Sequence, residues 1–181
     1  MATREDYEQL KAFARIDGAL VGGLWILSFA CFVGEFYDPS FGILAFLLGA
    51  GSIIFATIRL RLFRDKVLDG CISFRRAFGY GMFTFAYAAL LMCAAQYVYF
   101  QFIDHGFIIS RYTEMVSTPE FKALMTAYGI KQTEMNVALD TLANLRPIEI
   151  AMQFLTTNII MGVIFSLPIA ALVRSNYKRR N

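Results

Sequence analysis

The stretch AFGYGMFTFAYAALLMCAAQYVYFQFI, residues 77–103, runs for 27 residues without a single Asp, Glu, Lys, Arg or His. A transmembrane helix needs about 20 apolar residues, and a charge at the centre of a bilayer is costly. Three other gaps between charged residues hold 17, 20 and 24 residues. Together the four gaps predict an all-α membrane protein with four transmembrane helices, at about 17–36, 40–60, 76–103 and 148–173.

The composition agrees with a membrane protein and argues against other classes. Of 181 residues, 57% are hydrophobic and 17% charged, whereas a soluble domain has about 45–50% and about 25%. A net charge of +3 without a Lys- or Arg-rich face disfavours nucleic acid as a partner. The apolar runs are continuous and lack the alternation of a membrane β-barrel. We therefore predict one four-helix transmembrane domain over residues 1–181.

The distribution of Lys and Arg predicts the orientation, because cytoplasmic loops carry an excess of both. Three precede the first span, six lie between the second and third spans, and four follow the fourth. The first loop has none, and the long loop 104–147 has four that are diluted by acidic residues. Both termini are therefore expected in the cytoplasm, and loop 104–147 outside.

Loop 104–147 is too long for a plain connection, and its pattern predicts two amphipathic helices. Thr118 and Pro119 are typical of an N-cap and a first helical residue, and Gly129 of a helix end. A second apolar stripe runs from Met135 to Leu145. We expect a helical hairpin that lies on the outer membrane surface or caps the bundle. At the other side, residues 5–16 form either an amphipathic helix on the inner leaflet or a cytoplasmic extension of the first span.

The loop between the second and third spans is basic, and two interpretations stay open. Each cation near an anionic membrane surface contributes about 1 kcal/mol of attraction, so the cluster is a candidate surface for lipid or a partner. Alternatively, it only fixes the topology. The cluster consists of Arg59, Arg61, Arg64, Lys66, Arg75 and Arg76.

Small residues recur at four-residue spacing in the first and fourth spans, where they let helix backbones approach closely. They pack the protein's own bundle or form the seam of a homodimer. The candidates are Gly18 and Gly22 in the first span and Gly162, Ser166 and Ala170 in the fourth.

Acidic residues lie at the predicted outer ends of the spans, beside the only histidine. A partly buried carboxylate there could bind a cation or relay protons, and the alternative is that these residues are caps and interface anchors. The weak cluster consists of Glu35, Asp38, Asp104, His105 and Glu149. Polar residues continue from Glu149 into the fourth span at Gln153, Thr156 and Asn158. One histidine and no ligand spacing predict no metal, and no cofactor is expected.

No motif supports catalysis. Gly79-Tyr80-Gly81 resembles part of a potassium filter, but it stands at the cytoplasmic start of a long helix instead of in an outward-facing re-entrant loop. The chain has no phosphate-binding loop, nucleophile elbow or zinc-protease motif. We predict no catalytic residue and no enzyme.

Four segments together resemble a known family. They are ALVGG at 19–23, ISFRRAFxxG at 72–81, YxYFxFID at 97–104, where x is any residue, and the exit of the fourth span at 168–174. The pattern is similar to small bacterial inner-membrane proteins of domain-of-unknown-function family 4199. The resemblance implies the inner membrane as location and no assigned activity. Its genes often neighbour membrane-associated family-2 glycosyltransferases, which implies a partner that acts on a lipid-linked sugar.

Two functional hypotheses follow. The first is a non-enzymatic accessory or scaffold protein that binds membrane lipids and either itself, as a homo-oligomer, or another membrane protein. The second is a small transporter or lipid-handling protein with a polar path from Glu149 through Gln153 and Asn158. A wet cavity along that path would favour transport, and a dry, close-packed core would favour the scaffold.

Overall fold

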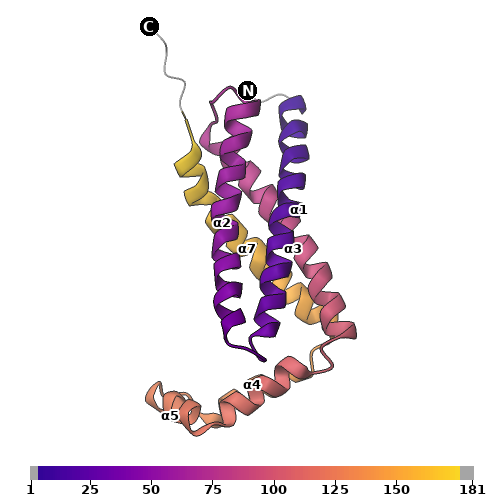
Figure 1. The fold of residues 1–181 in the computed structure, drawn as a ribbon, viewed down its shortest axis with the longest axis vertical. Helices are drawn as coiled ribbons and strands as arrows, with labels where there is room; N and C mark the ends of the chain where they lie inside the picture. Colours follow the sequence, from indigo (N-terminus) through magenta and orange to yellow (C-terminus); the bar gives the residue numbers. More distant parts are fainter. Residues whose placement is uncertain (1–3, 176–181) are drawn as a thin grey trace. The chain divides into compact units, whose positions relative to one another are not determined.

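The protein is all-helical over the residues that its computed structural model describes, 4–175 (Figure 1). Four of the seven helices described are long and apolar enough to cross a membrane. These are α1 (Arg4–Gly34), α2 (Ser40–Val67), α3 (Phe74–Phe102) and α7 (Pro147–Val173). The prediction of an all-α protein is confirmed, and the four predicted spans fall on the four helices that are long and apolar enough to cross a membrane. Each helix begins or ends several residues beyond the charge-free gap at one or both ends.

The chain divides into two compact units. The first comprises Met1–Ala94 and Phe154–Asn181, of which residues 4–94 and 154–175 are described. It holds α1, α2, most of α3 and most of α7. The second, Ala95–Gln153, holds the three shorter helices between the ends of α3 and α7.

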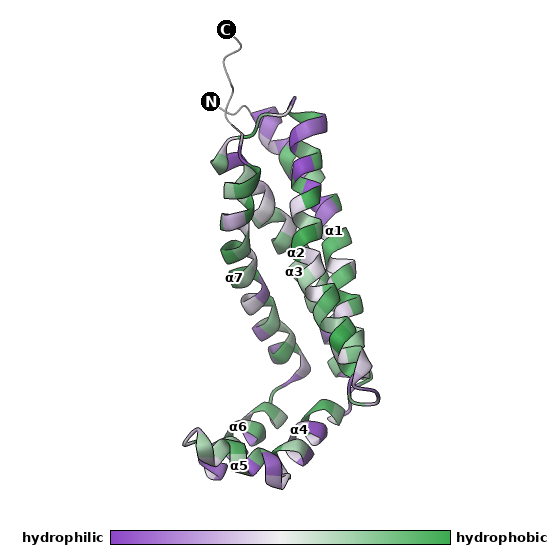
Figure 2. Ribbon diagram, turned by 60° about the vertical axis from the view of Figure 1, so that its left-hand side comes forward, coloured by the Kyte–Doolittle hydropathy of each residue, from purple (hydrophilic) through white to green (hydrophobic). Residues whose placement is uncertain are grey.

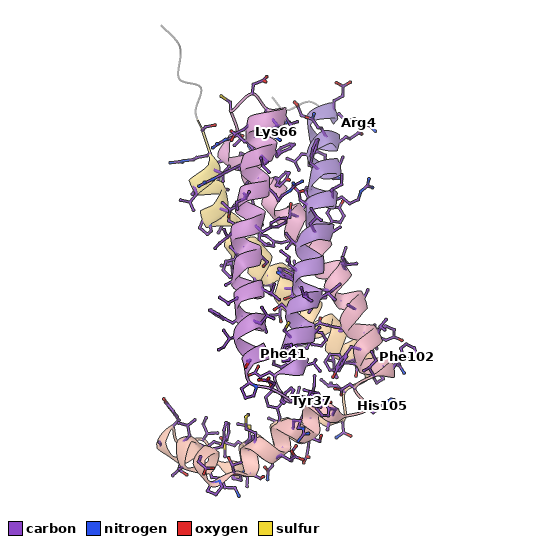
Figure 3. The ribbon with its side chains drawn as sticks, in the orientation of Figure 1. Arg4, Tyr37, Phe41, Lys66, Phe102 and His105 are labelled. Carbon is purple, nitrogen blue, oxygen red and sulfur yellow. The ribbon has the colours of Figure 1, made fainter. Side chains whose placement is uncertain are left out.

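In the first unit, α1 and α2 are antiparallel neighbours along their length (Figure 1). The connection is short because Asp38 organises the start of α2: its carboxylate accepts the Ser40 backbone N–H at 2.8 Å. Figure 3 shows Tyr37 and Phe41 at this turn, and Arg4 and Lys66 at the opposite end. We call that opposite end, where α1 begins and α2 ends, the basic end.

Both segments at the basic end continue the membrane helices. Helix α1 runs without a break from Arg4, so residues 5–16 are an extension of the first span and not a separate helix. Helix α2 carries the basic segment out to Val67. The chain then turns at Asp69 and Gly70, whose positive φ angles of 49° and 79° end the helix.

The end of α7 is tied to this turn. The Ser175 backbone N–H donates to the Ile72 carbonyl at 3.1 Å, and the Ser175 hydroxyl donates to the Gly70 carbonyl at 2.6 Å. Arg64 adds a hydrogen bond from its guanidinium to the Val173 carbonyl at 3.0 Å. The basic end therefore joins the start of α1 to the ends of α2 and α7 and the start of α3.

Hydropathy follows this arrangement. Figure 2 shows hydrophilic residues gathered at the basic end and long hydrophobic stretches through the middle of α1, α2 and α7. Many large apolar side chains in these stretches are exposed, among them Phe46, which is 73% exposed. Because lipid tails solvate such side chains as well as a protein core does, this exposure is what a membrane-spanning bundle requires.

The second unit contains one helix more than the sequence predicts. Helix α5 (Pro119–Ala127) begins as predicted, with the Thr118 hydroxyl accepting the Phe121 N–H, and α6 (Gln132–Ala143) contains most of the second stripe. The addition is α4 (Phe107–Ser117), which packs against both α5 and α6. Its adjacent isoleucines and Val116 have low helix propensity, and packing outweighs that preference by burying Ile108 and Val116.

Candidate functional site

A buried ion pair joins three helices of the first unit. Asp17 of α1 is 1% exposed. The Arg59 guanidinium of α2 donates to its Oδ1 from Nε at 2.6 Å, and the Arg59 Nη2 lies 2.5 Å from the same oxygen. The Tyr80 hydroxyl of α3 donates to Oδ2 of the same carboxylate. Both oxygens of Asp17 are therefore satisfied by residues from the two neighbouring helices.

Tyr80 is held in place by its own packing. Its side chain is 1% exposed, and its ring stacks on Phe63 of α2 with ring centroids 4.7 Å apart. Arg59 is the outermost member, since 31% of its side chain is exposed. The arrangement is a clamp between α1, α2 and α3 with one charge fully enclosed and the other reaching the surface.

The depth of this clamp explains why both charges belong there. Asp17 precedes the end of α1 by 17 residues, about 26 Å at the helical rise. Arg59 follows the start of α2 by 19 residues, about 28 Å. In an antiparallel pair these positions meet near one edge of a hydrocarbon core about 30 Å thick. The two residues lie at nearly equal distances from the α1–α2 turn, and this spacing predicts the pair, whereas the charge-free gaps alone do not.

The six basic residues of the predicted lipid or partner surface separate into two groups. Three make polar contacts within the first unit: Arg59 binds Asp17, Arg64 binds Asp65 at 2.6 Å as well as the Val173 carbonyl, and Arg76 lies 3.3 Å from Asp6. The other three, Arg61, Lys66 and Arg75, are exposed.

The small residues of α1 lie against α3. A Cβ atom on Gly18 would come within 2.6 Å of the Tyr87 Cβ and 2.7 Å of the Thr84 carbonyl oxygen. A Cβ atom on Gly22 would lie 3.2 Å from Ala88 backbone atoms. These distances leave no room for a side chain, so the glycines set how closely the two helices approach.

The small residues of α7 lie against the same helix. A Cβ atom on Gly162 would come within 2.5 Å of the Phe85 Cβ, and Ser166 lies beside Gly81. Ser166 and Ala170 are fully buried, and the Ser166 hydroxyl donates to the Gly162 carbonyl at 2.6 Å. In the first unit α3 is thus the central helix, with α1 and α7 packed closely on it.

The predicted outer acidic residues belong to different units. Glu35 and Asp38 are exposed at the α1–α2 turn of the first unit, where the hydrogen bond from the Ser40 backbone lowers the pKa of Asp38. In the second unit Asp104 is 7% exposed, His105 is exposed and Glu149 is half-buried. Within residues 4–175 no three His, Cys, Asp or Glu side chains are grouped closely enough to hold a metal ion.

Asp104 caps helix α4. Its carboxylate accepts the Gly106 N–H at 3.1 Å and the Ile108 N–H at 3.2 Å. The intervening His105 has a positive φ of 43°, and the chain turns there before α4 begins.

Asp104→Ala is expected to destabilise the second unit by about 1 kcal/mol, the typical cost of losing a helix cap. Hydrogen exchange of the α4 amides measures this loss. Asp140→Ala, an exposed acid on α6, is the matched control. Equal exchange in the two variants would show that Asp104 does not cap α4.

The predicted polar path begins at Glu149, whose carboxylate is already paired with Arg146. Arg146 donates to Glu149 from its backbone at 2.8 Å and from its guanidinium at 2.7 Å. This contact raises the pKa of Arg146. Gln153 and Thr156 are exposed, and Asn158 is half-buried. A further polar residue lies in α3, outside this path: Gln96 is 2% exposed, and its Oε1 is buried without a hydrogen-bond partner in the described part of the chain.

Comparison with known proteins gives one match. A family model described as "Protein of unknown function (DUF4199)" covers residues 17–175. No curated protein matches the chain, and no solved structure does. The matched range includes the whole clamp and all the small residues that pack on α3. The chain therefore belongs to the DUF4199 family.

Proposed function

We propose that the protein is a non-enzymatic accessory or scaffold subunit of the bacterial inner membrane. Its four helices anchor it, and its basic end and second unit supply the surfaces for lipids and a partner. The partner is a second copy of the chain or another membrane protein. The family resemblance implies a membrane glycosyltransferase that acts on a lipid-linked sugar as the first partner to test.

The close packing on α3 is the observation that carries this proposal. Gly18 and Gly162 bring α1 and α7 so near to α3 that a single added carbon would overlap its side chains. A bundle closed in this way favours a rigid support over a passage for solute. Exposed cations at its basic end, Arg61 and Lys66, are available for contacts with other molecules.

Photocrosslinking in native membranes tests the accessory role. A photoreactive residue at Arg61, Lys66, Tyr128 or Leu142 is expected to give a discrete protein adduct, because all four are exposed. The control is Phe46, which is 73% exposed on the apolar part of α2 and should meet mainly lipid. An adduct of two differently tagged copies identifies a homo-oligomer. No adduct at any of the four positions would contradict the proposal.

The proposed orientation places the basic end, and with it both termini, in the cytoplasm. Single cysteines at Lys66 and at Tyr128, in a chain whose three native cysteines are replaced, are expected to differ in labelling. A membrane-impermeant maleimide should reach position 128 in intact spheroplasts and position 66 only after lysis, because the positive-inside rule retains basic loops in the cytoplasm. Labelling of position 66 in intact cells would overturn this orientation.

A second candidate is a small transporter or lipid-handling protein, and Gln96 favours it. A buried amide oxygen without a partner costs about 1–3 kcal/mol, and water or a polar solute in a passage would supply that partner. Reconstituted vesicles that show solute flux or lipid scrambling, reduced by Gln96→Leu, would support this candidate. Vesicles that show neither activity would favour the scaffold over the transporter.

A further inference from the structure

A cavity of about 810 Å³ opens at the basic end, between the first turns of α1 and the start of α3. Its wall includes Asp6, Tyr7 and Leu10 on one side and Ser73, Arg75 and Arg76 on the other. It is separate from the clamp, although Gly79, which also lines it, is adjacent to Tyr80. All these residues belong to the first unit.

The cavity carries two arginines with unused hydrogen-bonding capacity. Arg75 is exposed and makes no ion pair or side-chain hydrogen bond within residues 4–175. Among the residues that the structure describes, the Arg76 guanidinium makes one 3.3 Å contact, with Asp6, and its buried Nε has no hydrogen-bond partner. Two guanidinium groups against one carboxylate leave the cavity with a net positive charge. Guanidinium groups bind phosphate oxygens well because they present paired N–H donors.

The opposite wall is amphipathic. Leu10 is 4% exposed, and the Tyr7 ring packs edge-on against Phe83 with centroids 5.8 Å apart. The Lys11 ammonium lies 4.5 Å from the centre of the Tyr7 ring, which adds a third cation beside this wall. The cavity thus offers cations on one side and an aromatic and aliphatic surface on the other, which fits an amphiphile better than a free anion.

The depth of the cavity matches the lipid headgroup layer. Leu10 precedes the end of α1 by 24 residues, about 36 Å along the helix. The hydrocarbon core is about 30 Å thick and the bilayer with headgroups about 40–45 Å. With the α1–α2 turn at one membrane surface, Leu10 and Tyr7 lie among the headgroups of the opposite leaflet.

We propose that this cavity binds the phosphate headgroup of an anionic phospholipid, with Arg75 and Arg76 as its phosphate ligands and Tyr7 and Leu10 beside the glycerol and upper acyl chains. The inference goes beyond the accessory role and needs no protein partner. It assigns to two of the six basic residues a defined site instead of a share in a diffuse surface.

Native mass spectrometry of the full chain in detergent tests the site. The probes are phosphatidylglycerol and phosphatidylcholine with identical acyl chains, and glycerol phosphate as the soluble headgroup. We expect a first phosphatidylglycerol to bind at least about tenfold more tightly than phosphatidylcholine, because only the former leaves its phosphate charge uncompensated. Tight binding of glycerol phosphate alone would identify a soluble phosphate ligand instead and overturn the lipid assignment.

Three variants separate a site from a surface. The double variant Arg75→Gln, Arg76→Gln is expected to bind the first phosphatidylglycerol about tenfold or more weakly than the native protein. The double variant Arg61→Gln, Lys66→Gln removes the same charge from exposed positions outside the cavity wall. Its affinity for the first phosphatidylglycerol should fall much less. Equal losses of affinity in the two double variants would overturn the proposed site and show that the lipid is held only by diffuse electrostatic attraction.

Gly79→Leu tests the cavity without removing charge. No atom lies within 4 Å of a Cβ at Gly79, so leucine has room there, and it is a better helix former than glycine. It should keep the fold and both arginines while occupying cavity volume, and the first phosphatidylglycerol should bind several-fold more weakly. Unchanged binding in this variant would show that the lipid does not enter the cavity.

Discussion

Replacing Arg59 by methionine is expected to destabilise the bundle by about 3 kcal/mol or more, because it leaves the enclosed Asp17 carboxylate without its countercharge. Asp17 cannot reach water, since only 2% of its side chain is exposed. Thermal unfolding in detergent measures the loss. The only tryptophan, Trp25 of α1, reports it well because it donates to Ser52 of α2 at 2.8 Å and stacks on Phe85 of α3.

The reverse change should cost less. Asp17→Asn leaves Arg59 charged, but that side chain is 31% exposed and can turn toward headgroups or water. We expect a loss of about 1–2 kcal/mol, the scale of a weakened hydrogen-bonded pair. The double variant should be more stable than Arg59→Met alone because no unpaired charge remains buried. A double variant whose loss equals the sum of the two single losses would show that the pair is not coupled.

Gly18→Ala is also expected to destabilise the bundle, although it adds only one carbon atom. The new Cβ would lie 2.6 Å from the Tyr87 Cβ and 2.7 Å from a backbone oxygen of Thr84, so α3 itself must move. Overpacking of this kind costs about 1–3 kcal/mol and occasionally more. The expected result is a lower unfolding temperature and a shifted Trp25 emission.

Gly23→Ala is the matched control in the same helix. No atom lies within 4 Å of a Cβ there, so only the gain in helix propensity remains, up to about 1 kcal/mol. The two substitutions are chemically identical and should change stability in opposite directions. Equal stability of the two variants would mean that α1 does not pack on α3 through Gly18.

The membrane helices could be predicted from sequence because the cost of burying charge acts on each segment separately. A gap such as 77–103 needs no knowledge of its neighbours. When each segment is considered alone, however, a charge that bounds a gap cannot be distinguished from the end of the helix. Asp17 and Arg59 bound two of these gaps, yet in the folded protein they neutralise each other, and α1 begins as early as Arg4.

The remaining features depend on contacts between elements. Tyr80 is one of nine tyrosines, and nothing in its local sequence marks it as the partner of Asp17. Helix α4 has poor helix formers and is stabilised by α5 and α6. The cavity arises where the start of α1 meets the start of α3, two segments about 70 residues apart in sequence. Of the residues that form contacts between the membrane helices, the small ones could be identified from the sequence, because their four-residue spacing follows one side of a helix.

Three consecutive residues of α3 serve three different neighbours: Gly79 lines the cavity, Tyr80 reaches Asp17, and Gly81 accommodates Ser166 of α7. Successive residues point about 100° apart on a helix, so this triplet fixes the rotation of α3 about its own axis. An insertion or deletion between Arg76 and Phe85 would rotate the residues that follow it by about 100° relative to those that precede it. The contacts on the two parts of α3 could then no longer form together. Within this family, the segment that corresponds to Arg76–Phe85 is expected to keep its length.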